Sequence, residues 1–139
     1  MGVAFALIFA NVGAAYGTAK SSVGIANLGC VEPGKIFRAL IPIIMAGILG
    51  IYGLIVAVLL QAKTDDAGLQ AKDGFRLFAA GICCGFSALA SGLAIGVAGE
   101  AGVKAYAQTD GIFVGMILTL IFAEAIGLYG LIIAIIMST

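Results

Sequence analysis

The sequence predicts an all-α membrane protein with four transmembrane helices that derive from a duplicated helical hairpin. Three observations lead to this fold class: an apolar composition, four long windows with at most one charge each, and an internal repeat. Hydrophobic residues make up 63% of the chain and charged residues only 10%, whereas soluble domains carry about 25% charged residues. This composition indicates a chain that folds in a lipid bilayer.

Four apolar windows define the expected spans in chain order: the first three carry no charge, and the last carries only Glu124. They cover residues 1–19, 39–62, 77–99 and 111–139. Each has about the 20 apolar residues that a helix needs to cross the hydrocarbon layer. Because the lipid cannot bond backbone polar groups, each span should be a helix. A β-barrel is disfavoured, since these runs are continuously apolar and do not alternate.

Three polar connections separate the spans. Residues 20–38 include the turn signal Glu32-Pro33-Gly34, residues 63–73 are the most polar, and residues 104–110 are short. Four spans put both termini on one side of the membrane. Lys and Arg are slightly more frequent in the first and third connections, which favours the cytosol for these two. Pro42, early in the second span, is expected to bend that helix.

An internal repeat relates the two halves of the chain. The segment GIYGLIVA at 50–57 matches GLYGLIIA at 127–134 in six of eight positions, at an offset of 77 residues. The segment GAAYGTA at 13–19 matches GLAIGVA at 92–98 in four of seven, at an offset of 79. Two spans therefore form a unit that is duplicated.

The repeat predicts one membrane domain, residues 1–139, made of two hairpins. We expect the first hairpin at 1–62 and the second at 73–139, running parallel about an axis along the membrane normal. The 77-residue offset aligns Glu124 with Gly47. Only the second hairpin thus retains a carboxylate at this position.

Glu124 is the one formal charge in the last span and the strongest functional candidate. It lies thirteen residues beyond Gly111, roughly 20 Å along a helix and so near the bilayer centre. A charge there costs at least ~2.5–3.5 kcal/mol on insertion scales. A neutral carboxyl group can face lipid, whereas an ionised one needs water or a cation. A group that carries a proton through lipid and releases it at a polar channel must have both properties. Sodium is the alternative cargo, but it needs several oxygen ligands, and only Thr119 is near in sequence.

Small residues recur along the first and third spans. This small-xxx-small pattern lets helix backbones approach closely. We expect close packing in a narrow inner ring of helices, with the second and fourth spans facing lipid; ordinary pairing within one bundle is the alternative. The residues assigned to this packing are Gly13, Gly17, Gly92 and Gly96.

Few other polar residues lie within the spans. Tyr52 and Tyr129 occupy equivalent repeat positions, and Tyr52 is expected to support the Glu124 carboxyl group across the helix pair. Hydroxyl groups in membrane helices usually bond their own backbone, which we expect here too. The residues concerned are Ser87, Ser91 and Thr119.

The remaining composition argues against several kinds of site. The chain has no His, and Cys30, Cys83 and Cys84 show no metal-ligand spacing. We expect no metal, no cofactor and no catalytic residue. The net charge of zero also argues against nucleic-acid binding. Glu100 and Lys104 are expected to form a solvated pair.

Three segments carry a resemblance to a known family. GAAYGTAKSSVGI (13–25), IPIIMAGILGIYGLIVAVL (41–59) and FVGMILTLIFAEAIGLYGLI (113–132) resemble the c-type proteolipid family of the eukaryotic vacuolar-type proton ATPases, in its c or c-prime form. The resemblance implies a rotor ring of such subunits in vacuolar or other acidic organelle membranes, with both termini lumenal. Each copy would be non-catalytic, and ATP hydrolysis in a separate soluble head would turn the ring.

The resemblance also implies how Glu124 works. The matching glutamate is protonated and deprotonated once per pass of the stator, whose a-type protein bears an essential Arg. A tyrosine matching Tyr52 lies near it. The implied partners are other copies and paralogues of the ring subunit, the a-type stator protein, the d-type protein of the central stalk, the lipid bilayer and protons.

Two other classes of protein compete with this interpretation. A small four-span proton-coupled multidrug-type transporter also needs one membrane carboxylate, but such carriers usually have an aromatic-lined cavity, and the chain has no Trp. A structural pore built as a ring would not need Glu124.

Overall fold

Four long helices and short connections make up the protein in a computed structural model, which describes all 139 residues. All four are long and apolar enough to cross a membrane, which agrees with the predicted fold class. The elements in chain order are α1 (Gly2–Val31), the short 3-10 helix η1 (Pro33–Lys35), α2 (Ile36–Ala39), α3 (Ile41–Thr64), α4 (Ala71–Gln108) and α5 (Ile112–Ser138).

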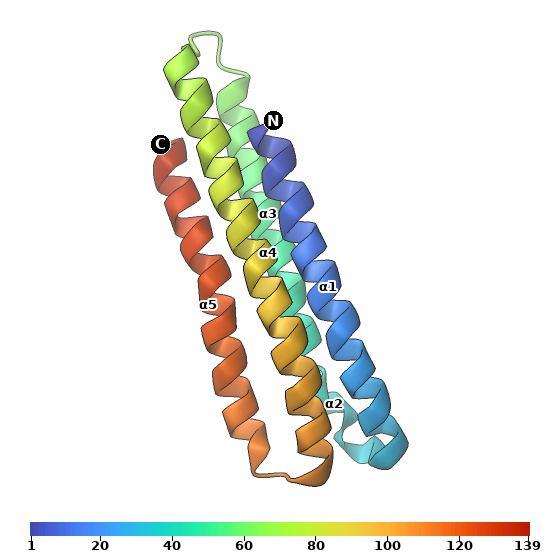
Figure 1. Cartoon of the computed structure of the whole chain (residues 1–139). Helices are drawn as coiled ribbons and strands as arrows, with labels where there is room; N and C mark the ends of the chain where they lie inside the picture. The colour runs from blue at the N-terminus through green and yellow to red at the C-terminus, as the bar shows by residue number, and fades with distance from the viewer.

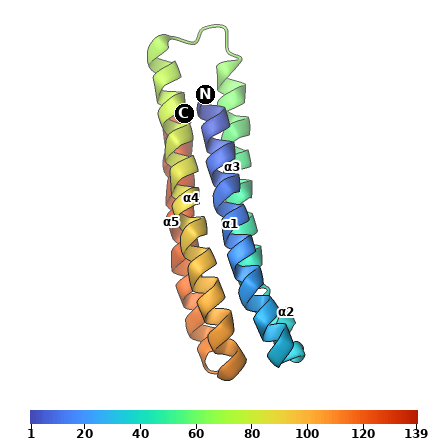
Figure 2. The same cartoon turned by 45° about the vertical axis from the view of Figure 1, so that its right-hand side comes forward.

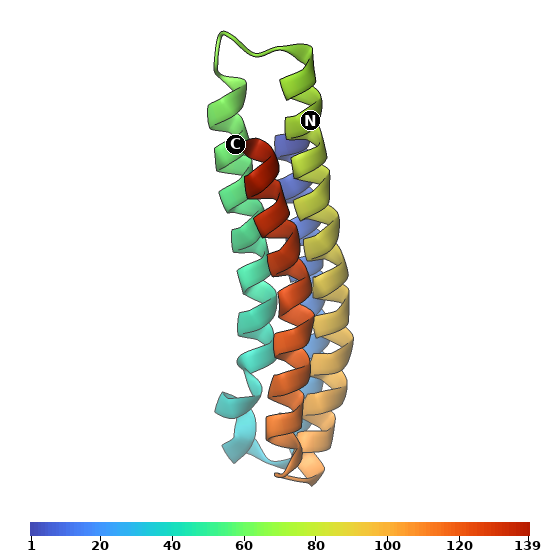
Figure 3. The same cartoon turned by 90° about the vertical axis from the view of Figure 1, so that its left-hand side faces the viewer.

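The helices lie side by side in an elongated bundle with both termini at one end (Figure 1). Helices α1 and α4 run in one direction, and α3 and α5 return. Seen from another side, α1 and α3 form one layer and α4 and α5 the other (Figure 2). The most extensive helix contact joins α1 to α4, and α5 lies on the opposite side of the bundle from α1 (Figure 3). The parallel arrangement of the two hairpins is as expected.

Helices α1 and α4 extend well beyond the apolar windows from which the spans were predicted. Helix α1 continues to Val31, so most of the expected first connection, 20–38, is helical. The turn signal is correct, because η1 begins at Pro33. Pro42 lies in the first turn of α3, where its missing N–H costs no intrahelical bond. The helix is interrupted just before it, at Leu40 between α2 and α3, so the second span is broken close to the position where a bend was expected.

The Gly-rich stripes bring α1 and α4 together within one chain. A Cβ added at Gly13 would lie 2.6 Å from the Ala88 carbonyl oxygen, and one at Gly17 would lie 2.9 Å from that of Gly92. Gly96 packs against the backbone of Gly17 in the same way. The stripes therefore form the contact between hairpins that the sequence left as the alternative. Contacts of these glycines between copies of the chain stay a prediction.

A cluster around Lys35 joins the two hairpins at the end opposite the termini. Lys35 Nζ lies 3.0 Å from Glu32 Oε2, forms an ion pair with Asp110, and donates to the Tyr106 carbonyl oxygen at 3.1 Å. The Nζ also lies 4.8 Å from the centre of the Tyr106 ring. The hydrogen bonds to Asp110 and Glu32 raise the pKa of Lys35 above its ordinary value. These contacts link the first connection to the third.

A second charged group lies nearby on the α1–α4 contact. Lys104 Nζ donates to Glu100 Oε1 at 2.9 Å, which confirms the expected pair. Lys20 of α1 adds a longer contact of 3.6 Å to the other carboxylate oxygen. Lys20 thus connects α1 to the Glu100–Lys104 pair of α4, outside the apolar windows.

Candidate functional site

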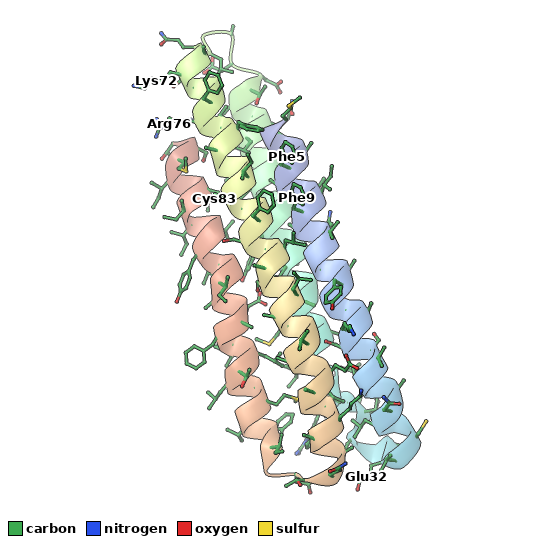
Figure 4. All side chains as sticks on the ribbon, in the orientation of Figure 1. Phe5, Phe9, Glu32, Lys72, Arg76 and Cys83 are labelled. Atoms are coloured by element: carbon green, nitrogen blue, oxygen red, sulfur yellow. The ribbon has the colours of Figure 1, made fainter.

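Glu124 lies in the middle of α5, far from the charged ends of the bundle. Lys72 and Arg76 mark one end and Glu32 the other, while apolar side chains such as Phe5 and Phe9 lie between (Figure 4). Both carboxylate oxygens of Glu124 are buried, and neither has a hydrogen-bond partner in the chain. An ionised carboxylate in this position would lack compensation for its lost hydration. The chain alone therefore accommodates the neutral acid.

Tyr52 is brought to the carboxylate by α3. Its half-buried ring packs between the two apolar clusters of the bundle core. The hydroxyl is close enough to interact electrostatically with Glu124, but its geometry is not that of a hydrogen bond. The supporting role of Tyr52 stays a prediction, with its position in accord.

The repeat counterpart of Glu124 has a different environment. A Cβ added at Gly47 would meet no atom within 4 Å. A larger side chain at this position is therefore not excluded by packing inside the chain. The absence of a second carboxylate is a property of the sequence and not a steric requirement of this fold.

The hydroxyl groups of the spans divide into two kinds. Thr119 bonds its own helix as expected, donating to the Gly115 carbonyl oxygen at 3.0 Å. Ser91 does not: it donates from α4 to the Ala123 carbonyl oxygen of α5 at 2.6 Å. The expectation for Ser91 is wrong because α4 and α5 pack closely beside Gly127, which brings a backbone carbonyl of α5 within hydrogen-bond distance of the hydroxyl. Ser87 packs against Gly130 of α5.

Other candidate residues lie away from Glu124. Tyr129 is 64% exposed on the outer face of α5. Cys84 is fully buried and unoxidised, as is typical of a small packing residue, and its thiol contacts the Tyr52 carbonyl oxygen at 3.8 Å. No cluster of three His, Cys, Asp or Glu side chains has metal-binding geometry.

Sequence reasoning missed one polar residue within the first span. The side-chain oxygen of Asn11 in α1 packs against Gly50 of α3. An Asn inside an apolar window was the available signal. Asn11 makes no hydrogen bond to Glu124.

Comparison with known proteins adds to this geometry. The family described as the C subunit of ATP synthase matches two stretches of the chain, residues 1–60 and 78–137. The chain belongs to this ATP synthase C-subunit family. The two stretches lie in the first and second halves of the chain, and the second includes Glu124.

Similar members of the family are found among animals. The second 16 kDa proteolipid c-subunit of the V-type proton ATPase of Caenorhabditis briggsae is 53% identical over 141 residues, covering 100% of this chain and 88% of the relative. The 16 kDa proteolipid c-subunit of Ascaris suum has the same identity and coverage. That of Ovis aries is 52% identical over 139 residues, covering 100% of this chain and 89% of the relative. These findings confirm the resemblance and lend no support to the transporter alternative.

Proposed function

We propose that this chain is a proton-carrying rotor-ring subunit of the membrane sector of a vacuolar-type ATPase. The buried Glu124 carboxylate without a partner, at the centre of an apolar helix, carries this proposal. Family membership and the relatives' names support a proton-translocating subunit. The protein is non-catalytic, since its relatives are named as proteolipid subunits of the pump.

The geometry suits a carrier that alternates between two charge states. Protonated, Glu124 is uncharged and is tolerated where its oxygens lie, away from water. Deprotonated, it needs a cationic group to replace the lost hydration, and no Lys or Arg lies within the 111–139 window. An essential Arg of the a-type stator protein would supply that charge from outside, once per pass of the ring. Tyr52 would then hold the carboxyl group between passes.

The same proposal assigns the ends of the bundle. Both termini lie at one end, which would be lumenal, with the first and third connections towards the cytosolic head and the d-type protein of the central stalk. The ring would combine copies and paralogues of this protein in a vacuolar or other acidic organelle membrane. We also propose that 1–62 and 73–139 are duplicated hairpins, which the two separate family matches support.

The decisive test replaces the carboxylate by its neutral isostere. Glu124→Gln should abolish ATP-driven acidification in membrane vesicles while leaving ring assembly intact, because the amide cannot exchange a proton near neutral pH. Glu100→Gln is the matched control, since Glu100 is a carboxylate outside the apolar windows paired to Lys104. Normal acidification by the Glu124→Gln pump would refute the proposal.

The cargo is tested by chemical labelling. A hydrophobic carbodiimide should modify Glu124 and stop pumping, because it reacts with protonated carboxyl groups in apolar surroundings. Millimolar sodium should not slow this reaction, because sodium needs several oxygen ligands and the one hydroxyl residue near Glu124 in sequence, Thr119, bonds its own helix. Protection by sodium would identify the site as a sodium site.

A further inference from the structure

Ser91 of α4 bonds α5 at Ala123, the residue directly before Glu124, the proposed proton carrier. Its hydroxyl donates to the Ala123 carbonyl oxygen at 2.6 Å, and the residue is 0% exposed. A hydrogen bond formed away from water is stronger than one at a surface, and its loss leaves the acceptor with one partner fewer. We propose that Ser91 is a positioning residue that holds Glu124 in its buried place by fixing α5 against α4. This inference rests on the proposed function of Glu124.

The bond is the one side-chain hydrogen bond between α5 and another helix. The other side-chain hydrogen bonds of α5 stay within it: Thr119 bonds Gly115, and Ser138 bonds Ile135. Near Glu124, α5 otherwise meets its neighbours mainly through apolar groups such as Leu49, which tolerate small rotations and shifts; the Arg38–Phe113 contact lies at the far end of the helix. A hydrogen bond weakens steeply with distance and angle. Ser91 therefore sets the rotation of α5 at the level of its carboxylate.

The packing around the bond is built from glycine. One helical turn beyond Ala123, a Cβ added at Gly127 would lie 2.5 Å from Leu49 Cδ2 and 3.4 Å from Ser91 Oγ. The bare backbone at Gly127 lets α5 approach α4 and α3 closely. Without that approach the short Ser91 side chain would not reach a carbonyl of another helix.

The internal repeat provides a comparison within the chain. Under the 79-residue offset Ser91 aligns with Val12, which has no donor, and under the 77-residue offset Glu124 aligns with Gly47. In the first hairpin the polar side chain that packs against Gly50, the counterpart of Gly127, is Asn11. The Ser91 bond joins the two helices of the second hairpin, and no such side-chain hydrogen bond joins α1 to α3. The interhelical bond thus occurs in the hairpin that carries the carboxylate, which points to a role at the site.

The test compares carbodiimide labelling of Glu124 in assembled pumps carrying Ser91→Ala or Thr119→Val. Each variant removes one hydroxyl–backbone bond that involves α5, but only the first bond crosses helices. Ser91→Ala should speed labelling about threefold or more, because the freed helix exposes the carboxylate. It should also shift the pH of half-maximal labelling by about half a unit. Thr119→Val should match the unmodified pump in both measurements.

Conservative variants separate positioning from simple destabilisation. Ser91→Thr retains the hydroxyl group and should restore the original pH profile. If Ser91→Ala rings do not assemble, Ser91→Cys takes their place. Its thiol is a weaker donor of similar size, so the pH profile of labelling should still differ measurably from that of the unmodified pump. A Ser91→Ala or Ser91→Cys profile that superimposes on the original overturns the inference, as does an equal shift in Thr119→Val.

The unmodified pump distinguishes this inference from the function on which it rests. Absence of Glu124 labelling in that pump would contradict the proposed function. Labelling that stops pumping, together with unchanged profiles in the Ser91 variants, would leave the function standing and overturn the positioning role alone.

Discussion

Substitution of Gly13 tests whether the α1–α4 contact depends on bare backbone. An Ala Cβ at this position would lie 2.6 Å from the Ala88 carbonyl oxygen and 2.7 Å from Leu89 Cα. Ordinary contact begins at 3.4 Å, so the two helices would have to separate by up to about 0.8 Å. Both obstructing atoms belong to a helix backbone and cannot rotate aside.

The expected cost of Gly13→Ala follows from two opposing effects. Overpacking in a filled core costs about 1–3 kcal/mol, and the rigid neighbours place this site in the upper half of that range. The higher helix propensity of Ala offsets roughly 0.5–1 kcal/mol. We expect a net loss of about 1–2.5 kcal/mol in the free energy of unfolding.

Gly74→Ala is the matched control for this prediction. Gly74 lies in the first turn of α4, near the charged end of that helix, and a Cβ there would meet nothing within 4 Å. Ala should therefore stabilise the protein by roughly 0.5–1 kcal/mol. Thermal unfolding of the detergent-extracted protein, followed by circular dichroism, should move in opposite directions for the two variants. A Gly13→Ala protein as stable as the Gly74→Ala protein would refute the reasoning.

Three further outcomes are expected. Lys35→Met should lower the unfolding temperature at neutral pH, because it breaks the link to Glu32 and Asp110; an unchanged temperature would show that the cluster contributes nothing to stability. The pKa of Lys35 is raised in the folded protein, so its contribution to stability is full below the ordinary pKa of 10.5 and is lost as the pH rises through the raised pKa. The unmodified protein should therefore lose stability at strongly alkaline pH more steeply than Lys35→Met. A water-soluble maleimide should modify the exposed Cys30 and spare the buried Cys84, and rapid modification of Cys84 would contradict its place in the core.

The sequence alone is sufficient for the topology. Lipid provides no partners for backbone polar groups, so each apolar window had to become a helix, and four such windows place both termini at one end. It also identifies Glu124, because a carboxylate at mid-depth in an apolar helix has a high cost that demands a function.

Helix ends were harder to predict from charge. Helix α1 continues past Lys20 to Val31, because a charge ends a membrane span without ending a helix. Pro42 was expected inside the second helix but lies in the first turn of α3. The N–H groups of a first turn have no partner within the helix, so a proline is tolerated there.

The tertiary structure decided which groups meet. Sequence spacing places Gly13 and Gly92 on two stripes of small residues, but only the packed bundle shows that these stripes face each other within one chain. Ser91 has the same local sequence cues as a serine that bonds its own helix, and its bond to Ala123 depends on how closely α5 approaches. The sequence determined the spans and the carboxylate, because burial in lipid acts on each segment separately. The contacts that hold the carboxylate depend on distances between helices, which only the folded bundle defines.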